Sequence, residues 1–360
     1  MSFKNYKDFI EEGDLVFAWI SRGMIKPIHV DSTQCLNTRY GTFNHSSMVG
    51  QRYGSQIASK TGYGFIYLLH PTPELWTVSL PHRTQIVYSP DSSYITQKLN
   101  ILPGSRVIEA GTGSGSFTHS LSRTISDTGK LFTYEFHEVR YQKALEEFQD
   151  HGLKNLQLTH RDVCKNGFEI EGEVINANAI FLDLPAPWSA IPNLDKVINK
   201  GMKTTICCFS PCIEQVEKTI HELHKQNWTS IETVEINHRK WESHKNMVRK
   251  LDDVIARLKD IQQRKREGVE KLRKARDERL NKRPAEEEME NDDGEKKVKT
   301  QNNYKKDVNV EKSQSFNPFG KGLRIKQGDP NFEWKNVSKD ESEIKSHTSF
   351  LTFAFKLPEF

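Results

Sequence analysis

The 360-residue sequence has few cysteines and no long apolar run. Its five cysteines are odd in number and unevenly spaced, and no Cys-x-x-Cys pair occurs. We therefore expect reduced thiols, no disulfide scaffold and no metal site. No apolar stretch approaches the ~18 residues that cross a bilayer, and residues 1–12 lack the apolar core of a secretory signal. We expect neither a membrane protein nor a secreted one.

Apolar residues are also scarce. They make up 35% of the chain against 28% charged residues, with a mean hydropathy of −0.69. A typical soluble domain is about 45–50% apolar, so we expect the polar excess to lie in one segment. The net charge of +4 says little about partners, because 52 basic residues are offset by 48 acidic ones. The length predicts two domains and an insert.

Residues 1–80 differ from the residues that follow in the pattern of predicted strands and helices. In 1–80, short β-rich runs at 15–20, 28–30, 55–58 and 65–69 alternate with turn signals, which predicts a small β-barrel or sandwich. From residue 81, strands alternate with helices, which predicts an α/β domain with a mostly parallel sheet. The apolar run at 350–355 returns to that sheet, so we assign 81–238 plus 346–360 to one domain.

Residues 239–345 form a charged insert. The segment 239–283 has helix propensity, with 17 basic and 8 acidic residues, a net charge of +9. Its apolar residues from Leu251 to Ile261 follow helical spacing. We expect this segment to contact RNA or a partner rather than to be merely solvated. Residues 284 to about 315 lack periodicity and are expected to be disordered.

A glycine loop follows the strand predicted at 105–110. Gly111, Gly113 and Gly115 alternate with small residues, and Glu109 precedes them. Dinucleotide sites prefer Gly-x-Gly-x-x-Gly, so this spacing favours S-adenosylmethionine; a dinucleotide site and an ordinary turn remain alternatives. Glu135 ends the next strand, where its carboxylate can accept hydrogen bonds from ribose. Asp162 is placed to meet the adenine of the cofactor.

A second strand end carries the predicted chemistry. Asp183 is followed by Pro185, Pro187 and Trp188, which combine an acid, a stiff turn and an aromatic face. A purine held here could donate its exocyclic amine to Asp183 and direct the neighbouring ring nitrogen at a methyl donor. The alternative is that Asp183 only caps the following helix.

Motifs spread over most of the chain resemble those of the catalytic subunits of eukaryotic tRNA (adenine-58-N1)-methyltransferases, and of fungal members in particular. The glycine loop alone would not be specific, but the combination is. The matching segments are His70–Trp76, Leu80–Ile86, Glu109–Ser116, Glu135–His137, Asp183–Trp188, Phe209–Gln215 and Ser346–Thr348.

This resemblance implies a Rossmann-like class I methyltransferase domain with a small N-terminal β-barrel. It implies S-adenosylmethionine as cofactor and Asp183 as the catalytic carboxylate, which also borders the donor. The other donor-binding residues that it implies are Gln85, Ile86, Val87, Tyr88, Ser89, Gly111, Thr112, Gly113, Ser114, Gly115, Ser116, Glu135, Arg140, Asp162 and Val163. Those implied to face the RNA are Thr38, Arg39, Tyr40, Leu184, Pro185, Phe209, Ser210, Pro211 and Cys212.

The resemblance also implies partners and a cellular location. The substrate is tRNA, whose T-loop adenine must be exposed before it reacts. A related, non-catalytic subunit pairs with the catalytic chain, and two pairs form a heterotetramer. Basic clusters at Lys282–Pro284 and Lys296–Lys299 suggest nuclear import.

Three other functions are weighed against this one. A non-catalytic tRNA-binding scaffold should have a damaged glycine loop and no acid at the strand end that precedes the Pro185 turn. Here Gly111, Glu135 and Asp183 are all present. A methyltransferase could act on another RNA adenine. A nucleotide-dependent oxidoreductase would bind NAD, so calorimetry with NAD and S-adenosylmethionine separates it from a methyltransferase.

Overall fold

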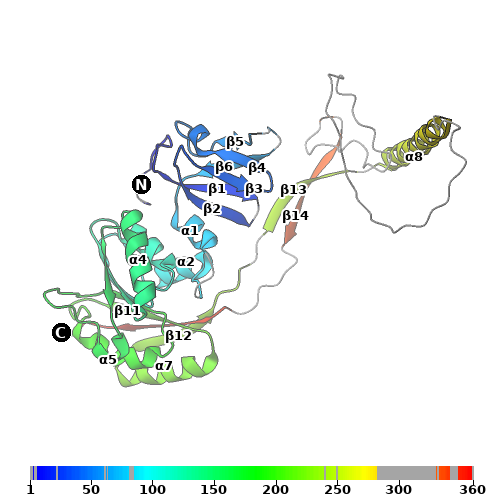
Figure 1. The fold of residues 1–360 in the computed structure, drawn as a ribbon. Coiled ribbons are helices and arrows are strands. Elements are labelled where there is room, and N and C mark those ends of the chain that lie inside the picture. Colours follow the sequence, from blue (N-terminus) through cyan, green and yellow to red (C-terminus); the bar gives the residue numbers. More distant parts are fainter. Residues whose placement is uncertain are drawn as a thin grey trace, which may run out of the picture. The chain divides into compact units, whose positions relative to one another are not determined.

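The computed structural model (Figure 1) describes two compact units. One comprises residues 1–238 and 345–360, and the other 239–344. Described residues are 3, 6–21, 23–60, 62, 64–80, 85–238, 241–248, 250–281, 330, 332–340 and 348–358. None of the helices in these ranges has the length and apolar character that a membrane crossing requires.

The N-terminal part of the first unit is all-β. Four antiparallel strands lie in the order β2 (Met24–His29), β1 (Leu15–Ser21), β6 (Phe65–Leu69) and β5 (Gln56–Ala58). β3 (Cys35–Thr38) and β4 (Gly41–Asn44) form a separate hairpin. Among the described residues these strands form a sheet and a hairpin rather than one closed sheet, so the expected β-barrel is not confirmed. The sequence missed β3 and β4 because each buries a single apolar side chain.

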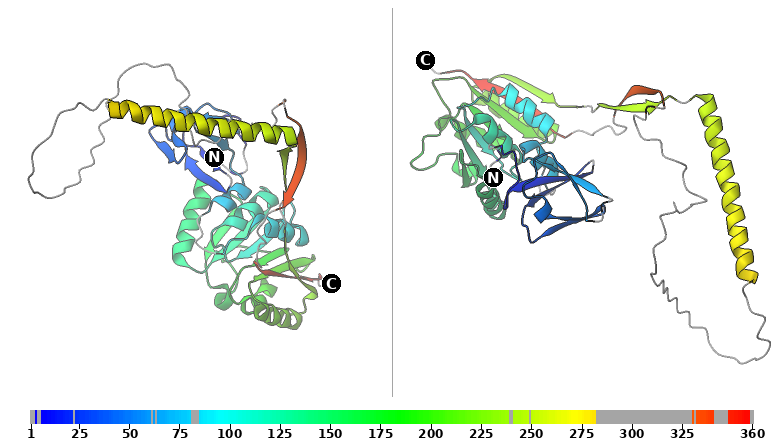
Figure 2. Two further views of the ribbon diagram at one scale, coloured as in Figure 1. Left: turned by 90° about the vertical axis from the view of Figure 1, so that its right-hand side faces the viewer. Right: turned by 90° about the horizontal axis from the view of Figure 1, so that it is seen from above.

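The larger part of the first unit is a seven-stranded sheet covered by helices (Figures 1 and 2). Every strand is parallel to the others except the C-terminal one, which confirms the expected Rossmann-like α/β architecture. The strand order is β12 (Thr229–Glu235), β15 (Phe350–Lys356), β11 (Thr204–Ser210), β10 (Ala179–Leu182), β7 (Arg106–Ala110), β8 (Lys130–Glu135) and β9 (Leu156–His160).

Both faces of this sheet are buried. Helices α2 (Ser89–Lys98) and α3 (Ser116–Ile125) pack on one face, and α5 (Val163–Asn166), α6 (Pro187–Ala190) and α7 (Ile213–Lys225) on the other. Cys207 and Cys208 show the alternation, because these neighbours on β11 enter opposite cores. Strands that are apolar on both faces are typical of a parallel sheet between helical layers.

Part of the charged insert differs from its predicted helix. Residues 241–247 form strand β13 (Trp241–Met247), which pairs with the distant strand β14 (Trp334–Asp340), so the helix expected there is wrong. Helix α8 (Leu251–Asn281) follows, and its apolar residues Leu251 and Leu258 are exposed. The segment expected to be disordered and the two basic clusters lie outside the described residues.

Helices α1 (Pro73–Ser79) and α4 (Glu138–Asp150) join the N-terminal sheet to the larger one around a buried histidine pair. His119 Nε2 and His151 Nδ1 lie 2.8 Å apart, and the rings of Phe3 and Trp76 pack against both histidines. Burial lowers the pKa of His119 to about 3 and that of His151 to about 4. Both imidazoles are therefore neutral in the folded protein at pH 7.

This pair should make the fold sensitive to acid. In the unfolded chain these histidines become protonated below pH ~6.5. In the folded chain they stay neutral down to about pH 4. Stability from the pair is thus complete above pH ~6.5 and is lost as the pH falls, by up to ~1.4 kcal/mol per pH unit for each group. Urea unfolding at pH 7, 6 and 5 should show a shallower acid loss in His151→Gln. The control His221→Gln, on an exposed face of α7, should keep the wild-type slope.

Candidate active site

The topology brings two loops together at one edge of the large sheet. The strand order reverses between β7 and β10: β8 and β9 continue on one side, and β11 on the other. Ligands of open α/β sheets bind at the carboxyl ends of the strands at such a reversal. The loops that begin here carry Gly111 to Gly115 after β7 and Asp183 to Ala186 after β10.

The backbones of these two loops are in contact. The Asp183 amide donates to the Ala110 carbonyl at 2.8 Å. A Cβ atom built on Gly111 would lie 2.1 Å from the Asp183 carbonyl oxygen, and the φ of Gly111 is +94°. A side chain is thus excluded at Gly111 by close approach and by backbone conformation. Glycine at this position places Asp183 directly against the loop.

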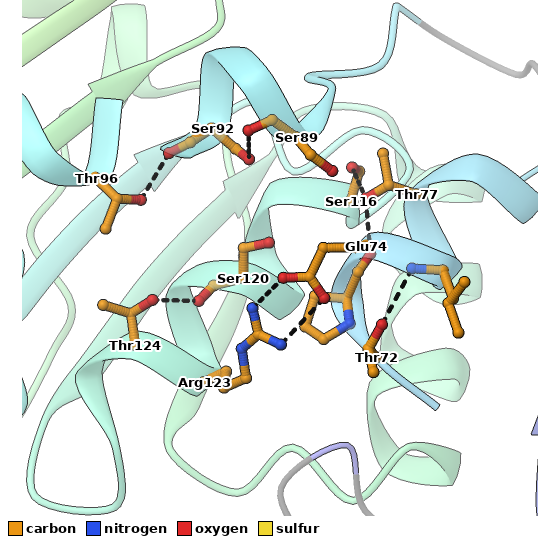
Figure 3. Close-up of polar contacts among 12 residues, drawn as sticks. Thr72, Glu74, Thr77, Ser89, Ser92, Thr96, Ser116, Ser120, Arg123 and Thr124 are labelled. Carbon is orange, nitrogen blue, oxygen red and sulfur yellow. Dashed lines mark hydrogen bonds and ion pairs between the residues drawn. The ribbon is translucent and has the colours of Figure 1, made fainter. Parts of the chain in front are cut away.

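A third segment, residues 85–88, is bound to the first residue of α3. The Ser116 hydroxyl lies 2.8 Å from the Thr77 hydroxyl of α1 and donates to the Val87 carbonyl at 3.0 Å. Figure 3 shows the Thr77 contact and, nearby, the ion pair of Glu74 with Arg123 that also joins α1 to α3. Ser116 therefore joins the glycine-loop helix both to α1 and to the Val87 segment.

Glu135 connects the glycine loop to the next helix. Its side chain is 2% exposed. Oε2 accepts from the Gly113 amide at 2.9 Å, while Oε1 accepts from the His137 amide and from Arg140 Nε and Nη2 at 2.8–3.0 Å. A carboxylate oxygen has two lone pairs, so Oε2 retains capacity for one more donor. A ribose hydroxyl fits that requirement.

A cleft of about 360 Å³ opens between these loops. This volume is within the usual range for small-molecule sites. It is lined by Gln85, Gly111, Gly113, Glu135, Arg140, Asp183, Leu184, Pro185, Pro211 and Gln215. A narrower recess beside it is lined by Gln85, Val87, Glu109, Gly111, Thr112, Gly113, Ser114, Ser116, Phe117, Phe181 and Asp183. The glycine loop, the spare acceptor on Glu135 and the surrounding carboxylates fit a cationic nucleoside such as S-adenosylmethionine.

Two carboxyl groups of the site have raised pKa values. Burial, and then the negative charge of Glu135, raises the pKa of Asp183 to about 7. Burial raises the pKa of Glu109 to about 7, although its Oε2 accepts from the hydroxyls of Thr118 and Thr133 at 2.7 and 2.8 Å. Carboxyls that are costly to ionise in isolation gain from a nearby cation. The site is therefore electrostatically suited to a positively charged donor.

Not every residue predicted to bind the donor lines the cleft. Gly115 is the N-cap of α3, while Ile86 is buried in the core around Trp76. Tyr88 and Ser89 begin α2. Asp162 caps α5 by accepting from the amides of Cys164 and Lys165, and Val163 is buried beneath the sheet.

The residues predicted to face the RNA are also divided. Leu184, Pro185 and Pro211 line the cleft. Phe209 and Ser210 are buried, so the Phe209 side chain does not face the cleft but packs on Phe181, whereas Cys212 is exposed at the start of α7. Thr38, Arg39 and Tyr40 lie at the β3–β4 turn, where the Arg39 guanidinium stacks 4.8 Å from the Tyr40 ring centre.

The segment that follows Asp183 differs from two of the sequence-based expectations. The N-cap of α6 is Ala186, so Asp183 does not cap that helix. Trp188 is not among the residues that line the cleft. Its ring centre lies 5.1 Å from Lys218 Nζ. Trp188 lies in α6, which begins at Pro187.

The sequence-based prediction missed Glu109 and Gln215 as site residues. Glu109 was noted only as the acid before the glycines, and its burial beside Thr133 depends on the pairing of β7 with β8. Gln215 lies in the first turn of α7, and its side chain donates to the Pro185 carbonyl at 3.0 Å. Nothing local in the sequence indicates that contact. Within the described ranges, no group of three His, Cys, Asp or Glu side chains could hold a metal ion.

The chain is similar to known tRNA methyltransferases. The family model for the tRNA methyltransferase complex GCD14 subunit matches residues 64–356. The tRNA (adenine(58)-N(1))-methyltransferase catalytic subunit of Candida albicans is 53% identical over 359 residues, covering 100% of both chains. That of Kluyveromyces lactis is 54% identical over 99% of this chain and 89% of its own, and that of Schizosaccharomyces pombe 47% identical over 99% and 97%.

Solved structures share the fold. A SAM-dependent O-methyltransferase from Thermotoga maritima aligns with a TM-score of 0.63 at 19% identity, covering 98% of this chain and 96% of its own. The tRNA (m1A58) methyltransferase TrmI from Aquifex aeolicus aligns with a TM-score of 0.60 at 20% identity, covering 97% and 99%. These alignments confirm the fold of a SAM-dependent methyltransferase.

The contacts of Glu135 generate a prediction about donor affinity. Glu135→Ala removes the acceptor of the Gly113 amide, the partner of Arg140 and the spare oxygen for ribose. We expect S-adenosylmethionine to bind about 10- to 100-fold more weakly, as for lost hydrogen bonds to a charged group. Isothermal titration calorimetry measures the change, with the exposed Glu138→Ala as control. A normal dissociation constant in Glu135→Ala would contradict the role.

Proposed function

Because the chain belongs to the family of tRNA methyltransferase complex GCD14 subunits, we propose that it is the catalytic subunit of a tRNA (adenine-58-N1)-methyltransferase. It transfers a methyl group from S-adenosylmethionine to N1 of the T-loop adenine. The observation that carries this proposal is Asp183, a partly buried carboxylate in the cleft beside an intact glycine loop. A non-catalytic scaffold needs neither feature.

The residues of the chain provide binding, orientation and charge. The bound donor supplies an electrophilic methyl group on a sulfonium. Glu135 and the glycine-loop amides hold its nucleoside, and Asp183 accepts a hydrogen bond from the 6-amine of adenine. Since N1 neighbours that amine, the contact directs the N1 lone pair into the cleft. Methylation makes the base cationic, and the carboxylate at Asp183 stabilises that charge.

The RNA must present a single unstacked base to this cleft. Opening the T-loop costs a few kcal/mol, which phosphate contacts offset. We propose that the Arg39–Tyr40 pair at the β3–β4 turn contributes to RNA binding, since a half-exposed aromatic and a guanidinium suit a nucleic acid. The basic segment 239–283 is proposed to track RNA phosphates, on the strength of its net charge of +9.

We also propose the assembly and its location. The chain pairs with a related, non-catalytic subunit, and two pairs form a heterotetramer. The names of the relatives, which describe a catalytic subunit and a complex, support a partner. A nuclear location is supported by the basic clusters Lys282–Pro284 and Lys296–Lys299 in the sequence. Imaging of a fluorescent fusion tests both proposals. A wild-type signal outside the nucleus would refute the location, and a nuclear signal that is unchanged when both clusters are replaced would refute their role in import.

The role of Asp183 is tested directly. Asp183→Ala should lower the single-turnover rate by about 10²- to 10³-fold, because the acceptor and the stabilising charge are lost. Donor affinity should stay within a few fold, since the glycine loop and Glu135 remain. Nucleoside mass spectrometry of unmodified tRNA identifies the product as 1-methyladenosine and its position. Unchanged turnover would refute the catalytic role, and methylation at another adenine would favour the broader RNA function.

The assembly is tested with the co-expressed subunits. Multi-angle light scattering of the purified complex should give the mass of two chains of each kind. Activity on tRNA should fall strongly when the catalytic chain is assayed alone, because the part of the tRNA-binding surface that the partner subunit provides is then missing. A complex of one chain of each kind with full activity would contradict the tetramer.

A further inference from the structure

Glu109 has one carboxylate oxygen that is engaged within the protein and one that is available to a ligand. Oε2 accepts from the Thr118 and Thr133 hydroxyls at 2.7 and 2.8 Å. Oε1 has no hydrogen-bond partner among the described residues, yet it is not one of the unpartnered atoms that are shielded from solvent. Because Glu109 is 1% exposed and lines the narrow recess beside the cleft, the accessible surface of Oε1 lies in that recess.

The recess has room for one small group and favours a cation. Its volume is about 20 Å³. Roughly 10–15 Å³ is enough to hold a water molecule, and an ammonium group has a similar size. Glu109 and Asp183 both line the recess, and no lysine, arginine or histidine is among its described lining residues. Burial raises the pKa of both carboxyl groups to about 7, so each one gains when a positive charge enters.

The position of the nucleoside indicates which part of the donor reaches the recess. Glu135, whose spare oxygen fits a ribose hydroxyl, lines the cleft but not the recess. The nucleoside therefore lies in the cleft, and the amino-acid end of the donor extends into the recess. A donor carboxylate would be repelled by Glu109, and the sulfonium must present its methyl group to the base. The α-ammonium group remains. The cleft and the recess adjoin, because they share the lining residues Gln85, Gly111, Gly113 and Asp183.

We propose that Glu109 Oε1 binds the α-ammonium group of S-adenosylmethionine in this recess. The inference rests on the proposed function for the identity of the donor. The threonine hydroxyls hold the carboxylate by its other oxygen and direct Oε1 to the ligand. Thr133 gives its proton to Glu109, so it accepts from the Thr112 hydroxyl of the glycine loop, 2.6 Å away. A short alkyl chain joins the ammonium to the sulfonium, so this contact also limits where the methyl group points.

A purely structural role is the competing explanation. Through Oε2 alone, Glu109 could tie α3 to β8 by the hydroxyls of Thr118 and Thr133. The two roles differ in one measurable quantity, the preference for a ligand that has the α-ammonium over one that lacks it. Loss of a structural contact weakens both ligands equally. Loss of the ammonium acceptor weakens only the ligand that has the ammonium.

The experiment uses the full-length chain with its partner subunit. Isothermal titration calorimetry compares S-adenosylhomocysteine with its desamino analogue, in which hydrogen replaces the α-ammonium. Both ligands lack the sulfonium, so the difference between them reports on the ammonium alone. The wild type should bind S-adenosylhomocysteine about 10- to 100-fold more tightly, as for a hydrogen bond between charged groups. Glu109→Gln keeps the shape of the side chain without its charge and should reduce that preference roughly tenfold.

The matched control is Thr118→Val, which removes one contact of Oε2 and keeps the carboxylate. It should retain a preference within about threefold of the wild type. Each preference is a ratio measured in one protein preparation, so a partial loss of folded protein changes the stoichiometry and not the ratio. The inference is overturned by an unchanged preference in Glu109→Gln, or by a preference that is lost only in Asp183→Asn. If the wild-type complex binds neither S-adenosylmethionine nor S-adenosylhomocysteine, the proposed function fails instead.

Discussion

The site depends on the contact between the backbones of Gly111 and Asp183. The glycine lets two neighbouring strand ends approach to a distance that any side chain would prevent. Because β7 and β10 are paired, the loops after them must share one crevice. On the proposed function, this places the methyl donor on the glycine loop and the base beside Asp183 in the same cleft.

The clustering of acids has a cost that the ligands offset. Burial raises the pKa of Glu109 and of Asp183, and the negative charge of nearby Glu135 adds to this effect on both. Arg140 compensates only Glu135. A sulfonium donor and a base that becomes cationic both bring positive charge into this surplus of negative charge. The carboxyl groups of the site thus favour the positive charge that develops in the reaction.

An apolar core joins the N-terminal sheet to the larger part of the first unit. Phe3 and Trp76 pack against the neutral pair of His119 and His151, and Phe17 packs on both of these aromatic rings. The Gly115 carbonyl in the glycine loop accepts from His119. This core lies beneath the end of the glycine loop. Mutations in the N-terminal sheet can therefore affect donor binding without touching the cleft.

The sequence by itself determined the alternation of strands and helices in the large sheet, the glycine loop and the acids at three strand ends. Each of these is a local pattern, set by residue spacing within about ten positions. Only the tertiary structure decided which of the candidate residues share the cleft. Asp162 became a helix cap, Phe209 entered the core, and Trp188 turned towards Lys218. Gln215 and Glu109 joined the site, and 241–247 became a strand because of a partner some 90 residues away. Such outcomes depend on pairing between distant segments, which local periodicity does not encode.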